Sequence, residues 1–60
     1  MITYLCILDQ PFIQIYVRKV EAESYEDAME KFVDYVTDDS NAMIEEDNIY
    51  CFELNGIATL

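Results

Sequence analysis

The sequence has no histidine, no tryptophan, one glycine and one proline among its 60 residues. Without histidine, the chain lacks the side chain that most often serves as a general base or metal ligand near neutral pH. With Gly56 alone, it cannot build the glycine-rich loops that bind phosphates and dinucleotides. A thiol nucleophile would have no imidazole beside it to accept its proton. These absences argue against an enzyme, and we expect a protein that binds another protein.

Residues for disulfides and metal sites are also scarce. The two cysteines, Cys6 and Cys51, are too few for a disulfide-rich secreted scaffold, and a structural zinc site needs about four cysteine or histidine ligands. The acidic stretch 38–47 does not match an EF-hand loop, because Met43 stands where that calcium site needs glycine. We therefore predict no metal and no cofactor. Both cysteines should be small, buried or half-buried hydrophobic residues, with a regulatory disulfide between adjacent strands as the alternative.

Basic residues are few, since 3 lysines and arginines stand against 13 acidic residues and give a net charge of −10. A field of this sign repels nucleic acid and anionic membranes. It attracts basic protein surfaces and accelerates encounter with them. The apolar fraction of 53% is too high for a disordered acidic tail, so the chain should fold. We expect no direct contact with nucleic acid or membranes, and a protein partner with a basic surface.

The apolar run at residues 2–8 is too short to span a membrane. It has no basic residue before it and ends at Asp9, so it does not read as a signal peptide either. We expect a cytoplasmic protein with reduced thiols. The chain should form a single domain, 1–60, which is marginally stable alone and gains support from oligomerisation or a partner.

Runs of aromatic and β-branched residues predict strands at 2–8 and 12–20, with a turn at 9–11 between them. Ser24 is a preferred helix N-cap, and Asp27 completes a capping-box pattern, so a helix should run from there to about residues 37–39. Residues 40–47 form either one short helical turn or an irregular acidic connection. A third strand at 48–54, the turn Asn55-Gly56 and a fourth strand at 57–60 complete the chain.

This order predicts an α+β fold, ββαββ. A right-handed crossover puts the third strand beside the first, so the sheet should be antiparallel, ordered 2-1-3-4, with one helix packed on one face. The helix should contact the sheet through an apolar stripe at helical spacing. The stripe consists of Tyr25, Ala28, Met29, Phe32, Val33 and Val36.

A three-residue loop at 9–11 pairs Leu8 with Phe12 and sorts the strand residues into two faces. The face expected under the helix holds Leu5, Ile7, Ile13, Ile15, Val17, Tyr50, Phe52 and Leu54. The face expected to stay open holds Tyr4, Cys6, Leu8, Phe12, Tyr16, Ile49 and Cys51. Soluble monomers rarely expose so large an apolar patch, so we predict a homodimer or second interface at Tyr4, Phe12 and Tyr16. A different loop length, or a 40–47 segment folded over the patch, would remove this prediction.

Acidic residues recur at helical spacing along one flank of the predicted helix, and we call this set the acidic ridge. It consists of Glu23, Asp27, Glu30, Asp34 and Asp38. Neighbours such as Glu30 and Asp34 are like-charge pairs that cost about 0.2–0.5 kcal/mol each, and only Asp27 has a basic residue, Lys31, four residues further along the chain. The ridge is either a solvated face kept acidic for solubility or a contact for a basic surface.

The short length, the negative charge and a hairpin followed by the acidic segment VEAESYEDA at 20–28 resemble the small acidic proteins that phages make against host defence. These are the anti-CRISPR and anti-restriction proteins. The resemblance implies an inhibitor that mimics nucleic acid by presenting carboxylates where phosphates would lie. The function we predict is an inhibitor that docks its acidic ridge on a basic, nucleic-acid-binding surface of a partner. The alternative is a homodimeric structural or adaptor module that works through its apolar aromatic sheet face.

Overall fold

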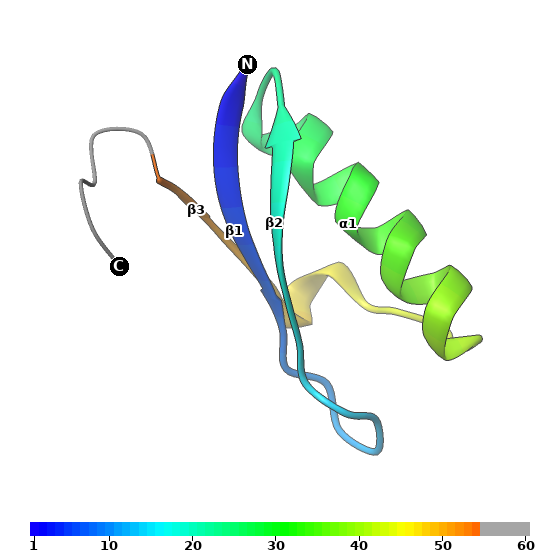
Figure 1. Cartoon of the computed structure of the whole chain (residues 1–60). Helices are drawn as coiled ribbons and strands as arrows, with labels where there is room; N and C mark the ends of the chain where they lie inside the picture. The colour runs from blue at the N-terminus through cyan, green and yellow to red at the C-terminus, as the bar shows by residue number, and fades with distance from the viewer. Residues whose placement is uncertain (55–60) are drawn as a thin grey trace.

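The computed structural model describes residues 1–54, which form an α+β fold. The strands are β1 (Ile2–Leu8), β2 (Tyr16–Ala22) and β3 (Ile49–Glu53), and helix α1 spans Tyr25–Ser40. The strands make one antiparallel sheet in the order β2-β1-β3, and α1 lies along one side of it (Figure 1). The predicted fold class and strand order are confirmed over this part of the chain. The predicted turn at Asn55-Gly56 and strand at 57–60 lie outside the described residues.

The hairpin between β1 and β2 is longer than predicted. Leu8 pairs with Tyr16, not with Phe12, so the loop covers residues 9–15 and β2 begins at residue 16. Pro11 has no amide hydrogen to donate to a ladder, and Phe12 has a φ of 73°, which no strand accommodates. The displacement from Phe12 to Tyr16 is an even number of residues, so the two predicted sets of alternating residues stay together.

The prediction of which set faces the helix was wrong. Tyr4, Cys6 and Leu8 of β1 are buried under α1, together with Tyr16 and Ile49. The physical reason lies in β2, where the positions in line with Tyr16 include the apolar Val20 and Ala22, and the alternating positions include Lys19 and Glu21. Burying the first set keeps Lys19 and Glu21 out of the core, and Arg18, the one charged residue of that set, stays exposed against the Tyr35 ring.

The core forms where α1 crosses the sheet. The predicted stripe is confirmed, since Ala28, Phe32 and Val36 are fully buried while Met29 and Val33 are partly buried against them. Tyr25, at the start of the stripe, remains 46% exposed. Its ring packs edge-on against Tyr4 with the ring centroids 6.5 Å apart.

The start of α1 follows the capping prediction, because the Ser24 side chain accepts a hydrogen bond from the Asp27 amide at 3.2 Å. The helix ends at Ser40, after which Asn41 takes a left-handed conformation with a φ of 56°. An irregular connection at 41–45 follows, and a short 3₁₀ helix, η1 (Glu46–Asn48), leads into β3. Within residues 1–54, no helix has both the length and the apolar character needed to cross a membrane.

Candidate functional site

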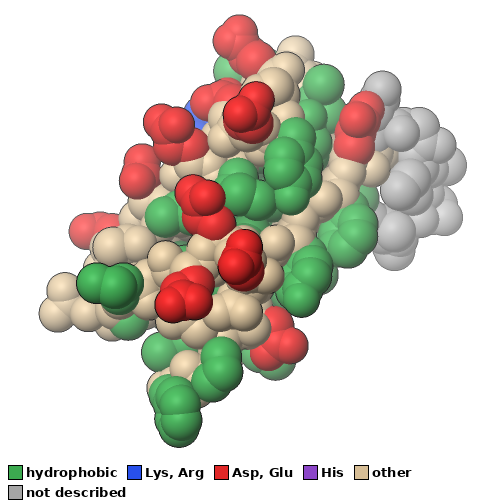
Figure 2. All heavy atoms as spheres, turned by 180° about the vertical axis from the view of Figure 1, so that it is seen from behind, with side chains coloured by type: hydrophobic (Ala, Val, Ile, Leu, Met, Phe, Trp, Pro, Cys, Tyr) green, Lys and Arg blue, Asp and Glu red, His purple; other side chains and the backbone are tan. Residues whose placement is uncertain are grey.

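The acidic ridge lies on the side of α1 that faces away from the sheet. Positions 30, 34 and 38 stand roughly opposite the buried positions 28, 32 and 36 around the helix axis. Glu30, Asp34 and Asp38 are exposed, as is Glu23 just before the helix, whereas Asp27 is half-buried. Viewed from behind in Figure 2, acidic side chains stand out across the surface while hardly any basic side chain is in view.

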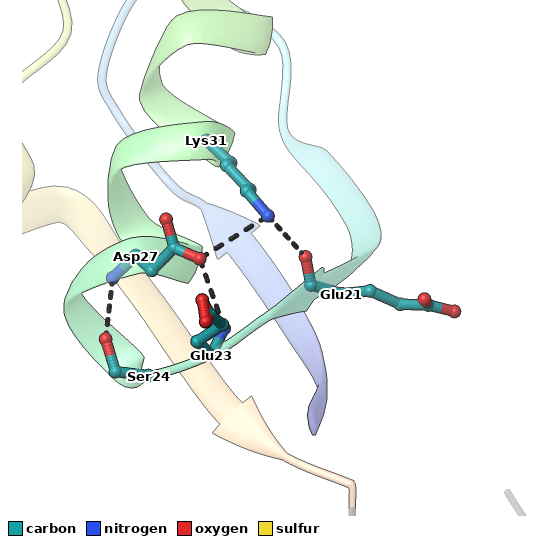
Figure 3. A network of polar contacts seen from close by, with 5 residues as sticks. All are labelled: Glu21, Glu23, Ser24, Asp27 and Lys31. Atoms are coloured by element: carbon teal, nitrogen blue, oxygen red, sulfur yellow. Dashed lines mark hydrogen bonds and ion pairs between the residues drawn. The ribbon is translucent and has the colours of Figure 1, made fainter. Parts of the chain in front are cut away.

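Asp27 differs from the other ridge residues because its carboxylate is engaged within the chain (Figure 3). Its Oδ2 accepts a hydrogen bond from the Glu23 amide at 3.1 Å and lies 3.4 Å from the Lys31 ammonium. These contacts, the backbone hydrogen bond above all, hold the pKa of Asp27 below its usual value. The Lys31 ammonium also donates to the Glu21 carbonyl at 2.9 Å, which ties α1 to the end of β2. Asp27 therefore anchors the start of the helix that carries the ridge.

The basic residues leave most of the ridge uncompensated. Lys31 pairs with Asp27, and the Arg18 guanidinium lies 4.1 Å from the centre of the Tyr35 ring. Lys19 points to the other side of the sheet, since it pairs with Leu5 in the ladder. Over residues 1–54 the Lys31–Asp27 contact is the one ion pair, so the remaining ridge carboxylates face solvent without a cation. The outer side of α1 thus carries a row of negative charges that no lysine or arginine within residues 1–54 pairs with.

A surface pocket of about 320 Å³ extends this acidic surface beside α1. It is lined by Glu26, Met29 and Glu30 of the helix and by Glu46 of η1. Three carboxylates around an aliphatic side chain match the charged head and apolar stem of a lysine or arginine. In the described part of the chain no group of three or more cysteine, aspartate or glutamate side chains is arranged to hold a metal ion.

A second surface is the side of the sheet that α1 does not cover, which we call the open sheet face. Its apolar residues are adjacent in the ladder, because Leu5 pairs with Phe52 while Ile7 pairs with both Val17 and Tyr50. Val17, Tyr50 and Phe52 are each more than half exposed. The charged residues on this face, Lys19 and Glu21, have opposite signs. The open sheet face is therefore apolar and carries no net charge.

The residues predicted for a dimer interface are separated by the structure. Tyr4 and Tyr16 are core residues, 5% and 8% exposed, so their predicted place on an open face was wrong. The Tyr16 hydroxyl donates to Asp39 at 2.8 Å, and this hydrogen bond, followed by burial, raises the pKa of Tyr16. Phe12, in contrast, is fully exposed at the tip of the β1–β2 loop. Its role in an interface stays a prediction.

Gln10, which sequence analysis missed, fixes the base of that loop. Its Nε2 donates to the Met43 carbonyl at 2.9 Å, and its Oε1 accepts from the Glu45 amide at 2.8 Å. The contacts join the hairpin to the connection between α1 and η1, beside a pocket of about 400 Å³ that Phe12 and Met43 help to line. A polar residue within a turn-forming segment gives no signal for contacts so far away in the chain.

The two surfaces lie on opposite sides of the sheet, because α1, which carries the acidic ridge, lies along one side of it and the open sheet face is the other (Figure 1). Any function must be inferred from their shape and charge. Comparison of the chain with protein-family models, with curated proteins and with solved structures found no match.

Proposed function

We propose that the chain is an inhibitory binding protein that docks its acidic ridge on the basic, nucleic-acid-binding surface of a partner protein. The observation that carries this proposal is the exposed row Glu30, Asp34 and Asp38 on α1, whose carboxylates make no ion pair within residues 1–54. Steps of four residues separate these carboxylates by about 6 Å along the helix axis. Alternate phosphates of one DNA strand are about 6.8 Å apart along the duplex axis, which is a similar spacing.

The cost of the ridge favours a partner over simple solubility. Glu30 with Asp34, and Asp34 with Asp38, are like-charge pairs that each cost about 0.2–0.5 kcal/mol. A domain of this size has little stability to spare, and charges placed elsewhere would serve solubility equally well. A basic partner converts the repulsion into attraction, because each carboxylate can then accept hydrogen bonds from arginine or lysine. The pocket at Glu26, Glu30 and Glu46 can bind one such side chain.

The negative field also affects how the complex forms. A net charge of −10 steers the chain toward a basic surface and repels it from nucleic acid itself. Docking excludes nucleic acid from the partner by occupying the same cations. Association should therefore slow as salt rises, since exposed charges are screened over about 8–10 Å at physiological ionic strength.

The test compares two double charge reversals with the parent chain. Glu30→Lys with Asp34→Lys removes the centre of the ridge, and Asp9→Lys with Asp47→Lys makes the same change of net charge at exposed sites outside α1. Each immobilised protein is used to capture proteins from a lysate of the cells in which it is made, with and without a DNA duplex as competitor. We expect the parent and the Asp9/Asp47 variant to capture a protein that the duplex releases, and the ridge variant to lose it. Equal capture by both variants would contradict the ridge mechanism.

A second candidate function is self-association through the open sheet face, in a homodimeric adaptor. The specific observation is that Val17, Tyr50 and Phe52 are 59%, 51% and 53% exposed on a face where Lys19 and Glu21 cancel in charge. Two strongly acidic chains can approach with least repulsion at such a face, and both ridges would then point outward. A standard interface buries about 800 Å² per partner, roughly a fifth of the 4364 Å² of this chain.

Two exposed phenylalanines give a matched test of this candidate. Sedimentation of the parent at micromolar to millimolar concentration should show a dimer that Phe52→Glu dissociates and Phe12→Glu leaves intact. A parent that stays monomeric throughout would exclude self-association, and a dimer sensitive only to Phe12→Glu would move the interface to the hairpin loop.

A further inference from the structure

Cys6 and Cys51 contact each other across the β1–β3 pair although they come from opposite ends of the chain. The ladder pairs them directly, and their Sγ atoms lie 3.1 Å apart. Both are free thiols. Cys6 is fully buried beneath α1, whereas Cys51 is half-buried on β3. The two thiols thus form a close pair with one accessible member.

The hydrogen bonds of the ladder show that this is a site where side chains approach closely. The Leu54 amide donates to Thr3, and the Asp9 amide donates to Asn48, which marks Thr3 and Asp9 as members of hydrogen-bonded pairs. Such pairs alternate with non-hydrogen-bonded ones along an antiparallel ladder, so Cys6 with Cys51 is a non-hydrogen-bonded pair. In these pairs the Cα atoms are about 4.5 Å apart, within the range of about 4.4–6.8 Å that disulfides span. Bond formation needs the Sγ atoms to approach by about 1 Å.

We propose that Cys6 and Cys51 are an oxidation site, a dithiol that a small-molecule disulfide such as oxidised glutathione converts into an intramolecular cross-strand disulfide. The site is separate from the acidic ridge and from the open sheet face.

The reaction begins at Cys51, the thiol that solvent reaches. Its thiolate attacks one sulfur of oxidised glutathione, whose S–S bond breaks, and one glutathione leaves as a thiolate. Cys6 then loses its proton and attacks the Cys51 sulfur, which releases the second glutathione. In total the protein loses two protons and two electrons, and the oxidised glutathione gains them to give two glutathione molecules. Burial, followed by the contact with the neighbouring Cys51 thiol, raises the pKa of the Cys6 thiol to about 12, so Cys6 suits the second, intramolecular step.

The cross-link joins β3 to its ladder neighbour β1. It closes a loop that contains β2, α1 and η1, and it thereby restricts the unfolded chain. For a domain of this size, a disulfide of typical effect raises the melting temperature by roughly 10 °C or more. Because β3 carries Tyr50 and Phe52, oxidation also ties the strand that holds these two residues of the open sheet face to β1.

The experiment equilibrates the full chain in mixtures of reduced and oxidised glutathione, quenches with acid and measures intact mass and free thiols. We expect the parent to lose both thiols together and two hydrogens in mass, to melt roughly 10 °C higher, and to revert with dithiothreitol. Cys6→Ala should accumulate glutathione on Cys51, because the resolving thiol is gone. Cys51→Ala should stay unmodified, because Cys6 is buried.

Three results would overturn the proposal. These are a parent that keeps both thiols in excess oxidised glutathione, a parent that accumulates a stable glutathione adduct as Cys6→Ala does, or oxidation that links Cys51 to Cys51 in a dimer. If Cys6→Ala does not fold, a protease digest of the oxidised parent decides, since the peptides around Cys6 and Cys51 must appear joined.

Discussion

On the α1 side of the sheet, apolar side chains are covered and the charge lies outside them; on the other side, apolar side chains are exposed and the charges cancel. Phe32 and Phe52 illustrate the contrast, because one is fully buried and the other is 53% exposed on the opposite side of the same sheet. In β2, Val20 packs beneath the helix, while its neighbours Lys19 and Glu21 lie on the open sheet face. The packing that stabilises the fold therefore lies on the α1 side, and the two exposed surfaces are the ones that we propose for binding.

Alanine substitutions at the two phenylalanines should produce the largest difference between the sides. Phe32→Ala should cost about 3–5 kcal/mol, enough to unfold a domain of this size, because it empties the centre of the core. Phe52→Ala should cost about 1 kcal/mol or less, because its side chain is already half in water. Urea denaturation of both variants measures these values. Similar losses at both positions would mean that the open sheet face is covered in solution.

Alkaline pH should lower the stability of the fold through groups that are buried on the α1 side of the sheet. Cys6 has a usual pKa of 9.0 that burial raises to about 12, so the folded state keeps a proton that the unfolded state releases. The contribution of the Cys6 thiol to folding stability is therefore complete below pH 9 and is lost as the pH rises from 9 toward 12. The pKa of Tyr16 is raised as well and acts in the same direction. Thermal melts should show stability falling above pH 9, with a shallower fall in Cys6→Ala; an identical fall in both would contradict the role of Cys6.

Removing the helix cap should have an intermediate effect. Ser24→Ala should cost about 1 kcal/mol in urea denaturation, because the Asp27 amide loses its acceptor.

The lowered pKa of Asp27 predicts a loss of stability in acid. Its contribution to folding stability is present above the usual pKa of 3.8 and is lost as the pH falls through the lower pKa of the folded state. Circular dichroism during acid titration of the parent and of Asp27→Asn checks this. The stability of Asp27→Asn should fall less steeply at low pH than that of the parent. The same fall in both proteins would mean that Asp27 does not cause it.

Neutralising the ridge should have the smallest effect on the fold, and in the opposite direction. Glu30→Gln with Asp34→Asn removes the like-charge pairs Glu30–Asp34 and Asp34–Asp38, so stability should rise by about 0.4–1 kcal/mol, twice the 0.2–0.5 kcal/mol of one such pair. Denaturation at low salt gives the best sensitivity because screening is weakest there. A loss of stability in this variant would mean that these carboxylates support the fold, and would count against a role in binding a partner.

Local features were predictable from the sequence because their causes lie within a few residues. The Ser24 cap and the buried positions 28, 32 and 36 depend on contacts inside one helix. The ridge positions follow from the same periodicity. The hydrogen bond from the Glu23 amide to Asp27 was not predictable in this way. It depends on the path of the chain before the helix, and the spacing of residues gives no information about that path.

The choice between the two faces of the sheet was not predicted correctly, because packing over a distance decides it. The signal was present in β2, where Val20 and Ala22 alternate with Lys19 and Glu21. A predicted strand that ended at residue 20 hid half of that alternation. The pairing of Cys6 with Cys51 on adjacent strands was foreseen, but they lie on the face beneath α1 instead of the open one.

The central claim, that the acidic ridge is the working surface, is tested most directly by titrating the captured partner with three proteins at low and high salt. These are the parent, the Glu30→Lys/Asp34→Lys variant and the Asp9→Lys/Asp47→Lys variant. The account predicts that the ridge variant loses binding at both salt concentrations, whereas the parent and the Asp9/Asp47 variant bind and weaken as salt rises. Binding that survives ridge reversal and does not respond to salt would contradict it.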